Sequence, residues 1–324
     1  MKIHLPNSAF LGNINAFLRT IDFTNKEILE ITSNEKWISV HPVVLCMVAS
    51  LGIEVLEKTP NNSIHCVKFK AASKHYFEVM GLFSFLNLNS EMDITKHESS
   101  GRFIPLTQIK KSSDLSRFIE DMIPLLHLDQ KNVQPIKYIV SELVRNVLEH
   151  SESKNGAIVC AQYYAKTNTI RIGIVDSGVG ISKTIRRSHS ASTNLESIRL
   201  ALTPGITGTT NKEGGTDYNA GAGLFFTKSI AKINRDFFIL YSGNTLFKLL
   251  KGKGRDKVNL FSDPFEDKHT KETDLPIWDG TVVGIDLQLT ETEEFTTLLE
   301  SIRNIYTTSV RERKKLKFKK PKFI

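Results

Sequence analysis

The sequence contains few cysteines and no long run of apolar residues. Its three cysteines, Cys46, Cys66 and Cys160, lie far apart among apolar neighbours, and no two of them have the spacing of metal ligands. An odd number at such separations does not indicate a disulfide framework, so we interpret them as reduced core residues. The longest apolar run covers residues 43–53 and is broken by a serine and a glycine. A membrane-spanning helix needs about 18 or more apolar residues, so none is expected.

The N-terminus lacks the basic start, apolar block and small-residue cleavage site of a secretory signal, and internal repeats are absent. We therefore expect a cytoplasmic protein. With 40% hydrophobic and 24% charged residues, the composition is typical of a folded globular protein and excludes wholesale disorder. The length of 324 residues predicts two domains, at about 100–200 residues per domain.

Positive charge is concentrated at one end of the chain. The segment Arg311–Ile324 holds eight basic residues and one acid, a net charge of +7, so the remainder carries only +1 of the total of +8. The body of the protein is therefore not expected to be a basic nucleic-acid-binding surface. Three roles stay open for the basic stretch Arg311–Lys322: contact with nucleic acid, contact with an anionic membrane surface, or a disordered, solubilising tail.

A polar stretch at residues 87–102 predicts a boundary between two domains. Before it, residues 1–100 show a β-α-β-α pattern, which predicts a small sheet covered by helices. The predicted elements are short strands at Glu27–Ile31 and Trp37–Val40, a helix at Pro42–Lys58, a strand at Ile64–Phe69 and a helix at Ser73–Leu86.

The second domain is expected to span residues 106–306, with residues 307–324 as a basic C-terminal tail. Helices followed by antiparallel strands predict a two-layer α/β sandwich, and the polar residues 251–273 predict a long loop within it. The predicted helices are Asp114–His127, Val133–Ser151, Asn194–Leu202, Gly223–Ile233 and Glu291–Tyr306, and the predicted strands are Ala157–Tyr164, Ile170–Val175, Phe237–Ser242, Leu246–Leu250 and Thr281–Leu289.

The segment Ile139–His150 places two functional groups on one helix face. Glu142 and Asn146 are four residues apart and lie beside an apolar stripe of helical spacing. A carboxylate and a carboxamide so arranged can orient an attacking hydroxyl or water and hold a hydrated metal. Magnesium keeps several waters and needs few protein oxygens when phosphates supply the rest. The alternative is an ordinary solvated helix face.

The segment Val175–Ile181 combines an acid with two glycines. An apolar strand delivers Asp176 into a turn that contains Gly178 and Gly180. An aspartate at this point can accept a hydrogen bond from an exocyclic amine, and the glycines let the backbone approach a flat ring closely. The alternative is a plain strand-to-loop turn.

A third segment opens a predicted helix with Gly221 and Gly223, followed by Leu224. Backbone N–H groups at such a helix start, together with the helix dipole, attract an anion. The preceding residues are rich in glycine and threonine, as in a mobile flap over phosphates or a flexible surface loop. A dinucleotide fingerprint does not fit, because Phe225 and Lys228 stand where later glycines would be required.

In their order, spacing and placement on helices and strands, these three segments resemble the N-box and the two glycine boxes of the GHKL ATPase superfamily. Gly280 and Thr281 resemble the Gly-Thr pair that the family places near adenine. The resemblance covers residues 106–290 and is greatest for the anti-sigma-factor serine kinases. It implies the Bergerat ATP-binding fold, with ATP and magnesium as ligands.

The resemblance also implies a role for each matched residue. Residues 182–220 would form a lid over the nucleotide, but the pattern does not select Lys212, Arg186 or Arg187 as a contact to the γ-phosphate. The implied roles are general base for Glu142, magnesium binding for Asn146, adenine binding for Asp176 with support from Thr281, shaping of the adenine pocket for Gly178 and Gly180, and phosphate binding through backbone amides for Gly221, Gly223 and Leu224.

Residues 37–86 resemble, more diffusely, a STAS domain, the fold of anti-sigma antagonists. The likeness rests on the order of a strand, an apolar helix and a strand, and on the ending Tyr76–Phe83. Ser39 stands where those antagonists carry a phosphorylated residue, but the aspartate and glycine of that turn are missing. A serine at the end of a strand is the alternative reading.

The expected function is therefore that of a Mg-ATP-binding protein, either an ATPase or a serine/threonine-protein kinase, in an anti-sigma-like system controlled in cis by the STAS-like domain. The phosphoryl acceptor stays open between water and a protein hydroxyl, as do a regulatory protein partner and a homodimer. One alternative is a nucleotide-gated binding module with negligible turnover. Another is a histidine-kinase output domain that uses His127, which Glu142 and the missing helical hairpin disfavour.

Overall fold

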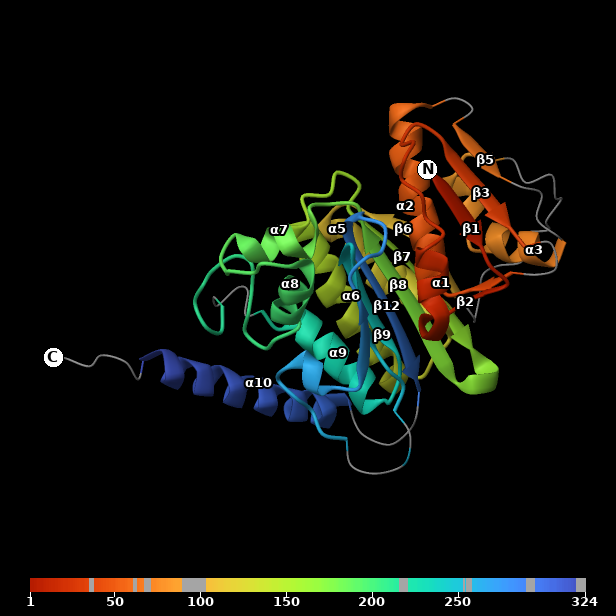
Figure 1. The fold of residues 1–324 in the computed structure, drawn as a ribbon. Helices are drawn as coiled ribbons and strands as arrows, with labels where there is room; N and C mark the ends of the chain where they lie inside the picture. The colour runs from red at the N-terminus through yellow and green to blue at the C-terminus, as the bar shows by residue number, and fades with distance from the viewer. Residues whose placement is uncertain are drawn as a thin grey trace.

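The fold is given by a computed structural model of the full chain. It combines helices and strands around a large antiparallel sheet (Figure 1). In the described part of the chain, every helix is too short or too polar to cross a lipid bilayer. The structure describes residues 1–34, 38–60, 63–66, 71–88, 103–215, 221–252, 254, 258–289 and 295–318.

The central sheet has seven antiparallel strands in the order β11-β10-β9-β12-β8-β7-β6. Its register pairs Thr281 of β12 with Asp176, the last residue of β8, so these two residues lie side by side at one end of the two central strands. The strands are β6 (Phe103–Ile109), β7 (Ala157–Tyr164), β8 (Thr169–Asp176), β9 (Phe238–Gly243), β10 (Thr245–Leu249), β11 (His269–Glu272) and β12 (Trp278–Gln288).

Both faces of this sheet are buried, because its central strands are apolar on both sides. In β8, Ile172 and Ile174 belong to one core cluster, whereas the intervening positions turn to the other face, where Val175 belongs to a second cluster. This two-residue alternation is the normal period of a strand. The sheet is therefore covered by helices on both sides rather than on one.

The first face is covered by α6 (Gln130–His150), α9 (Gly223–Ile233) and α10 (Phe295–Phe318). These three helices meet at Phe226, whose ring lies 6.1 Å from the rings of both Tyr138 and Tyr306. Shorter helices complete this side of the molecule: α5 (Ser112–Arg117), α7 (Gly180–Arg186) and α8 (Asn194–Ala201).

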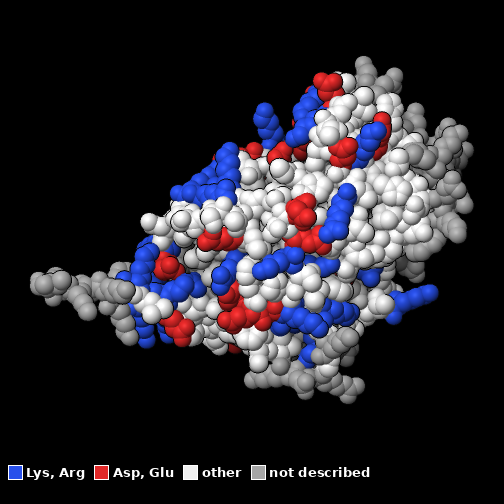
Figure 2. All heavy atoms as spheres, in the orientation of Figure 1, with Lys and Arg blue, Asp and Glu red and all other residues white. Residues whose placement is uncertain are grey.

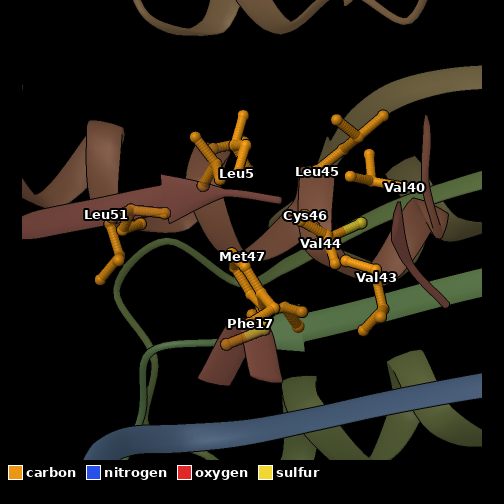
Figure 3. Packing of buried hydrophobic residues seen from close by; sticks show 14 of the residues in the cluster. Leu5, Phe17, Val40, Val43, Val44, Leu45, Cys46, Met47 and Leu51 are labelled. Carbon is orange, nitrogen blue, oxygen red and sulfur yellow. The ribbon is translucent and has the colours of Figure 1, made fainter. Parts of the chain in front are cut away.

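The second face is covered by α2 (Pro42–Lys58), a helix that buries 12 of its 17 residues (Figure 3). The helix approaches β8 so closely that a Cβ atom at Gly173 would lie 2.4 Å from the backbone of Val43. Glycine is thus required at this position of β8. Because Gly173 has no side chain, β8 leaves room for α2, which is packed on nearly all sides.

A smaller parallel sheet lies on the far side of α2 and has the order β1-β3-β5. Its residues and those of the large sheet belong to one continuous core cluster, so the N-terminal segment and the second face share their apolar packing. The elements of this segment are β1 (Lys2–Leu5), β2 (Ser8–Ala9), α1 (Ile14–Leu18), β3 (Leu29–Ser33), β4 (Ser39–Val40), β5 (Ile64–Cys66), α3 (Ala71–Val79) and α4 (Leu82–Phe85).

Several predicted elements have the observed bounds, namely α2, β7 and α9. The predicted helix Ser73–Leu86 is instead divided into α3 and α4, because Gly81 between them has a φ of +78°, outside the helical region. The predicted strand Ile64–Phe69 is β5 as far as Cys66, and its remaining residues lie outside the described residues, as does Trp37 of another predicted strand.

Three other predictions are corrected. The helix predicted at Asp114–His127 is α5 followed by a π-helical and a 3₁₀ turn, and Pro124 in the latter lacks the N–H that an α-helix needs. The predicted loop 251–273 contains β11. The helix predicted to end at Tyr306 continues as α10 to Phe318, since lysine and arginine are good helix formers and cations are favourable near a helix C-terminus.

Candidate functional site

The three segments singled out in the sequence surround one cavity of about 290 Å³. It lies between α6, α7 and the start of α9, over one end of β8 and β12. Every residue proposed as a site residue lines it except Gly178, which lies in the turn beside Asp176. The lining residues predicted from the sequence are Glu142, Asn146, Asp176, Gly180, Gly221, Gly223, Leu224 and Thr281.

Asp176 is the last residue of β8 and is 2% exposed. One of its carboxylate oxygens accepts a hydrogen bond of 2.8 Å from the backbone N–H of Gly178, and Thr281 donates from the paired strand. Burial raises the pKa of Asp176 to about 7, although hydrogen bonds from the backbone of Gly178 and from the side chain and backbone of Thr281 oppose the rise. A buried carboxyl that lines the cavity is suited to accept a hydrogen bond from an amine of a ligand.

The turn after Asp176 requires glycine for steric reasons. A Cβ atom at Gly178 would lie 2.0 Å from the carbonyl oxygen of Ser151, and the next residue, Val179, donates to that same oxygen at 2.7 Å. Gly280 on the adjacent strand has a φ of +115°, and a Cβ there would lie 2.1 Å from the carbonyl oxygen of Asp176. The backbone therefore packs directly against Ser151, at the end of α6, and against Asp176, which leaves no room for a side chain at either glycine.

Glu142 and Asn146 lie on the same face of α6 and point toward the start of α9. A Cβ atom at Gly223 would lie 3.0 Å from Oε2 of Glu142 and 3.1 Å from Nδ2 of Asn146. Burial raises the pKa of Glu142, while Arg145, whose Nη1 lies 3.3 Å from Oε1, opposes the rise and Glu149 adds to it. The carboxylate is therefore a stronger proton acceptor than an exposed glutamate would be.

The N-terminus of α9 faces the same cavity. The N-cap residue is Ala222, which has no side-chain acceptor for the first N–H groups of the helix. Gly221, just before the helix, has a φ of +64°, and its carbonyl oxygen accepts a hydrogen bond of 3.0 Å from Gly205 in the loop that closes the cavity. Such a helix start attracts an anion through its N–H groups and dipole.

The donor set suits a hydrated magnesium ion only when phosphates share the coordination. Among the described residues, no group of three or more His, Cys, Asp or Glu side chains could hold a metal by itself. The cavity provides one carboxamide, Asn146, and three carboxyl side chains, of which Glu142 shares the helix face of Asn146 while Glu149 and Asp176 line other parts of the wall. Oxygen donors of this kind and number fit magnesium, which retains much of its water.

Some lining residues were not predicted from the sequence. The walls include Ile174, Thr184 and Val283, which give the cavity an apolar side suited to a flat ring. Trp278, which is 2% exposed, donates from Nε1 to the carbonyl oxygen of Asp176 at 3.0 Å. Its position two residues before Gly280 could have marked Trp278 as a candidate site residue, but nothing in the sequence shows where its ring points.

The cationic candidates from the sequence lie elsewhere. Arg186 donates to the carbonyl oxygens of Ala191 and Ser192, Arg187 pairs with Glu152, and neither lines the cavity. Lys212 is likewise absent from the lining. Among the described residues, Arg145 is the one arginine that lines the cavity.

The N-terminal segment reaches the back of this site. Glu54 of α2 hydrogen-bonds with Ser177, the residue between Asp176 and Gly178. The ring of Phe23 meets that of Trp278 edge-on at 6.2 Å. The turn that holds Asp176 is thus supported by side chains from the opposite side of the sheet.

Two further residues considered in the sequence lie away from the cavity. His127 is exposed and has a φ of +46° in a turn after the 3₁₀ segment. Ser39 lies in β4, where its backbone N–H donates to Asn7 at 2.9 Å.

No protein-family model matches the chain, and no characterised protein matches it in sequence.

Proposed function

We propose that the chain binds Mg-ATP in the manner of the GHKL ATPases, in the cavity between α6, α7 and α9. One observation carries the proposal: three segments distant in sequence bring a buried carboxyl, a carboxylate–carboxamide pair and an open helix start to a single cavity. These are the groups that an adenine amine, a phosphate-bound magnesium and the phosphates themselves require.

In this proposal each end of the cavity recognises one part of the nucleotide. Asp176 accepts a hydrogen bond from the exocyclic amine of adenine, and Thr281 and Trp278 hold the aspartate in place. The backbone N–H groups at Gly223 and Leu224 bind phosphate oxygens. Asn146 contributes an oxygen to magnesium, which neutralises charge on the phosphates when it is bound.

Glu142 is proposed as the general base. It would take the proton of a water molecule or a protein hydroxyl as that group attacks the γ-phosphate, and its raised pKa favours this role. Because the base must be deprotonated, turnover is expected to increase with pH through that raised pKa. The two reaction classes are ATP hydrolysis and phosphorylation of a serine or threonine.

We further propose that the N-terminal segment is a STAS-like regulatory module acting in cis. The support is its packing against the back of the site, through Glu54 at Ser177 and Phe23 at Trp278. A change in how this segment packs would alter the position of the turn that carries Asp176. A regulatory protein partner and a homodimer belong to the same proposal, and nucleotide-dependent hydrogen exchange at α2 would test the link.

Binding is tested by titration calorimetry with ATP and GTP in the presence of magnesium. The wild type should prefer ATP, because guanine carries a carbonyl oxygen where adenine has its amine. Asp176→Asn should lower ATP affinity about 10- to 100-fold, the usual effect of losing a hydrogen bond to a charged group, and Asp274→Asn, at an exposed site, should not. Absence of adenine-nucleotide binding by the wild type would overturn the proposal.

Turnover is tested by phosphate release and by transfer of labelled phosphate. Glu142→Gln should keep ATP affinity and lose about 10²- to 10⁴-fold in rate, whereas Glu120→Gln, an exposed control, should keep both. Equal rates for the wild type and Glu142→Gln would instead favour a binding module without catalysis. Acid-labile labelling at His127 would favour a histidine-kinase role.

A further inference from the structure

The basic end of the chain is an ordered part of α10 as far as Phe318. Leu298, Ile302 and Val310 bury one side of this helix against the body, and α9 is one of the helices it contacts. The last basic turns therefore continue a helix that is already anchored. Figure 2 shows Lys and Arg side chains gathered near the C-terminal end of α10, at the left of the view.

One side of the basic turns is used within the protein. Nε of Arg313 lies 2.9 Å from Oε2 of Glu213, and the same guanidinium donates to the carbonyl oxygen of Pro204. One turn later, Nζ of Lys317 donates to the carbonyl oxygen of Asn211 at 3.3 Å. These contacts tie α10 to the loop 203–215 and fix which way the rest of its basic side chains face.

The opposite side of α10 is a solvent-exposed basic face. Residues three and four apart share a helix face. The residues on the side turned away from the loop are therefore those with this spacing that are also exposed. Between residues 301 and 318, Glu312 is the one acidic residue in the sequence. The members of this face, which we call the α10 basic face, are Arg303, Asn304, Thr308, Arg311, Glu312 and Lys315, all of them exposed. Lys314 is also exposed, but it lies beside the loop, since a Cβ atom at Gly214 would be 3.5 Å from its Nζ.

We propose that the α10 basic face docks on the phosphate backbone of a nucleic acid. Arginine and lysine supply the charge, and the asparagine and threonine between them supply neutral hydrogen bonds, which is the mixture that contacts phosphates. From residue 303 to residue 315 the face spans about 18 Å at about 1.5 Å per residue, long enough to follow several phosphates. The last 14 residues carry a net charge of +7, against +1 for the rest of the chain, so the attraction for phosphates is expected to be greatest at this end.

A membrane surface is less well matched by the same helix. A helix that lies in the lipid interface needs an apolar face beside its basic one, and the buried apolar residues of α10 already contact the protein body. Among the side chains of α10 that the structure describes, Leu316 is the one large apolar residue that is exposed, at 72%, and one residue does not form a face. The described side chains of the α10 basic face are all polar or charged.

The test measures fluorescence anisotropy of labelled 20-nucleotide duplex DNA and RNA with the full chain, without ATP, so it is independent of the proposed nucleotide site. Arg303→Gln/Arg311→Gln/Lys315→Gln should weaken binding at least tenfold at low salt. It should also reduce the slope of log affinity against log salt by about 2 to 3, at about 0.9 per phosphate contact.

A matched control removes three positive charges from exposed sites elsewhere, in Lys131→Gln/Lys154→Gln/Lys166→Gln. It should bind within about threefold of the wild type, since these lysines lie outside the α10 basic face. Thermal unfolding of both variants checks that they are folded. No binding by the wild type, equal losses in both variants, or binding to phosphatidylserine vesicles but to neither nucleic acid would each overturn the proposal.

Discussion

The face of the seven-stranded sheet under α2 is filled, whereas the face under α6 and α9 leaves a cavity at one end. Neighbouring residues of β8 illustrate the difference: Val175 is part of the core with α2, and Ile174 lines the cavity. On the filled face, side chains of the N-terminal segment support the turn after β8, and on the open face Asp176, although buried, lines the cavity. Rigid support on one side allows an incompletely packed site on the other.

The largest expected effect is on the filled face. Gly173→Ala should lower the free energy of unfolding by about 3 kcal/mol, because its Cβ would meet the backbone of Val43, which cannot move without shifting α2. Gly284→Ala is the control, with an expected cost of about 1 kcal/mol, since its Cβ meets movable side-chain atoms of Leu11 and Ile239. Chemical denaturation compares the two, and equal costs would contradict the close approach of α2.

The next effect is on the open face and depends on pH. The folded pKa of Asp176, about 7, is above the ordinary value of 3.8, so its protonation favours the folded state, and this contribution is lost as pH rises from about 4 through 7. A shift of this size is worth about 4 kcal/mol, and asparagine loses part of it because its amide nitrogen cannot accept the hydrogen bonds that the carboxylate accepts. Asp176→Asn should therefore stabilise the protein relative to wild type at pH 8, by about 2 kcal/mol, and much less at pH 4. Unfolding measured across this range would contradict the buried carboxyl if the difference stayed constant.

A smaller effect is expected where the two faces meet. Trp278→Phe leaves the carbonyl oxygen of Asp176 without the indole donor and should cost about 1 kcal/mol of stability. It should also weaken ATP binding several-fold, by loosening Asp176. Phe23→Leu removes the ring contact but keeps that hydrogen bond, so its effect on ATP affinity, measured by calorimetry, should be smaller. Equal effects on affinity would assign the role to packing instead.

The smallest effect is confined to the loop beside the cavity. Arg313→Ala should change global stability by about 0.5 kcal/mol, as is usual for partly exposed ion pairs, but should speed hydrogen exchange in residues 203–215. Lys315→Ala, which changes the exposed side of the same helix, should leave that loop unaffected. Unchanged exchange in both variants would mean that α10 does not restrain the loop.

Much of the local structure could be predicted from the sequence. Apolar periodicity gave the bounds of α2, β7 and α9, and four-residue spacing placed Glu142 and Asn146 on one face of α6. The division at Gly81 and the irregular turns around Pro124 were missed, because a period averaged over a window does not register a single breaking residue. The continuation of α10 beyond Tyr306 to Phe318 was missed, because the basic residues after Tyr306 were separated from the helix as a tail.

The amino-acid sequence by itself determined the individual elements, the placement of charge at one end, and the three short patterns that carry the candidate chemistry. Only the tertiary structure decided that these patterns enclose one cavity, that the indole of Trp278 donates to the carbonyl oxygen of Asp176, and that α2 covers the opposite face of the sheet. Periodicity is a property of near neighbours along the chain. The position of one element over another depends on long-range packing, to which every side chain of the sheet contributes.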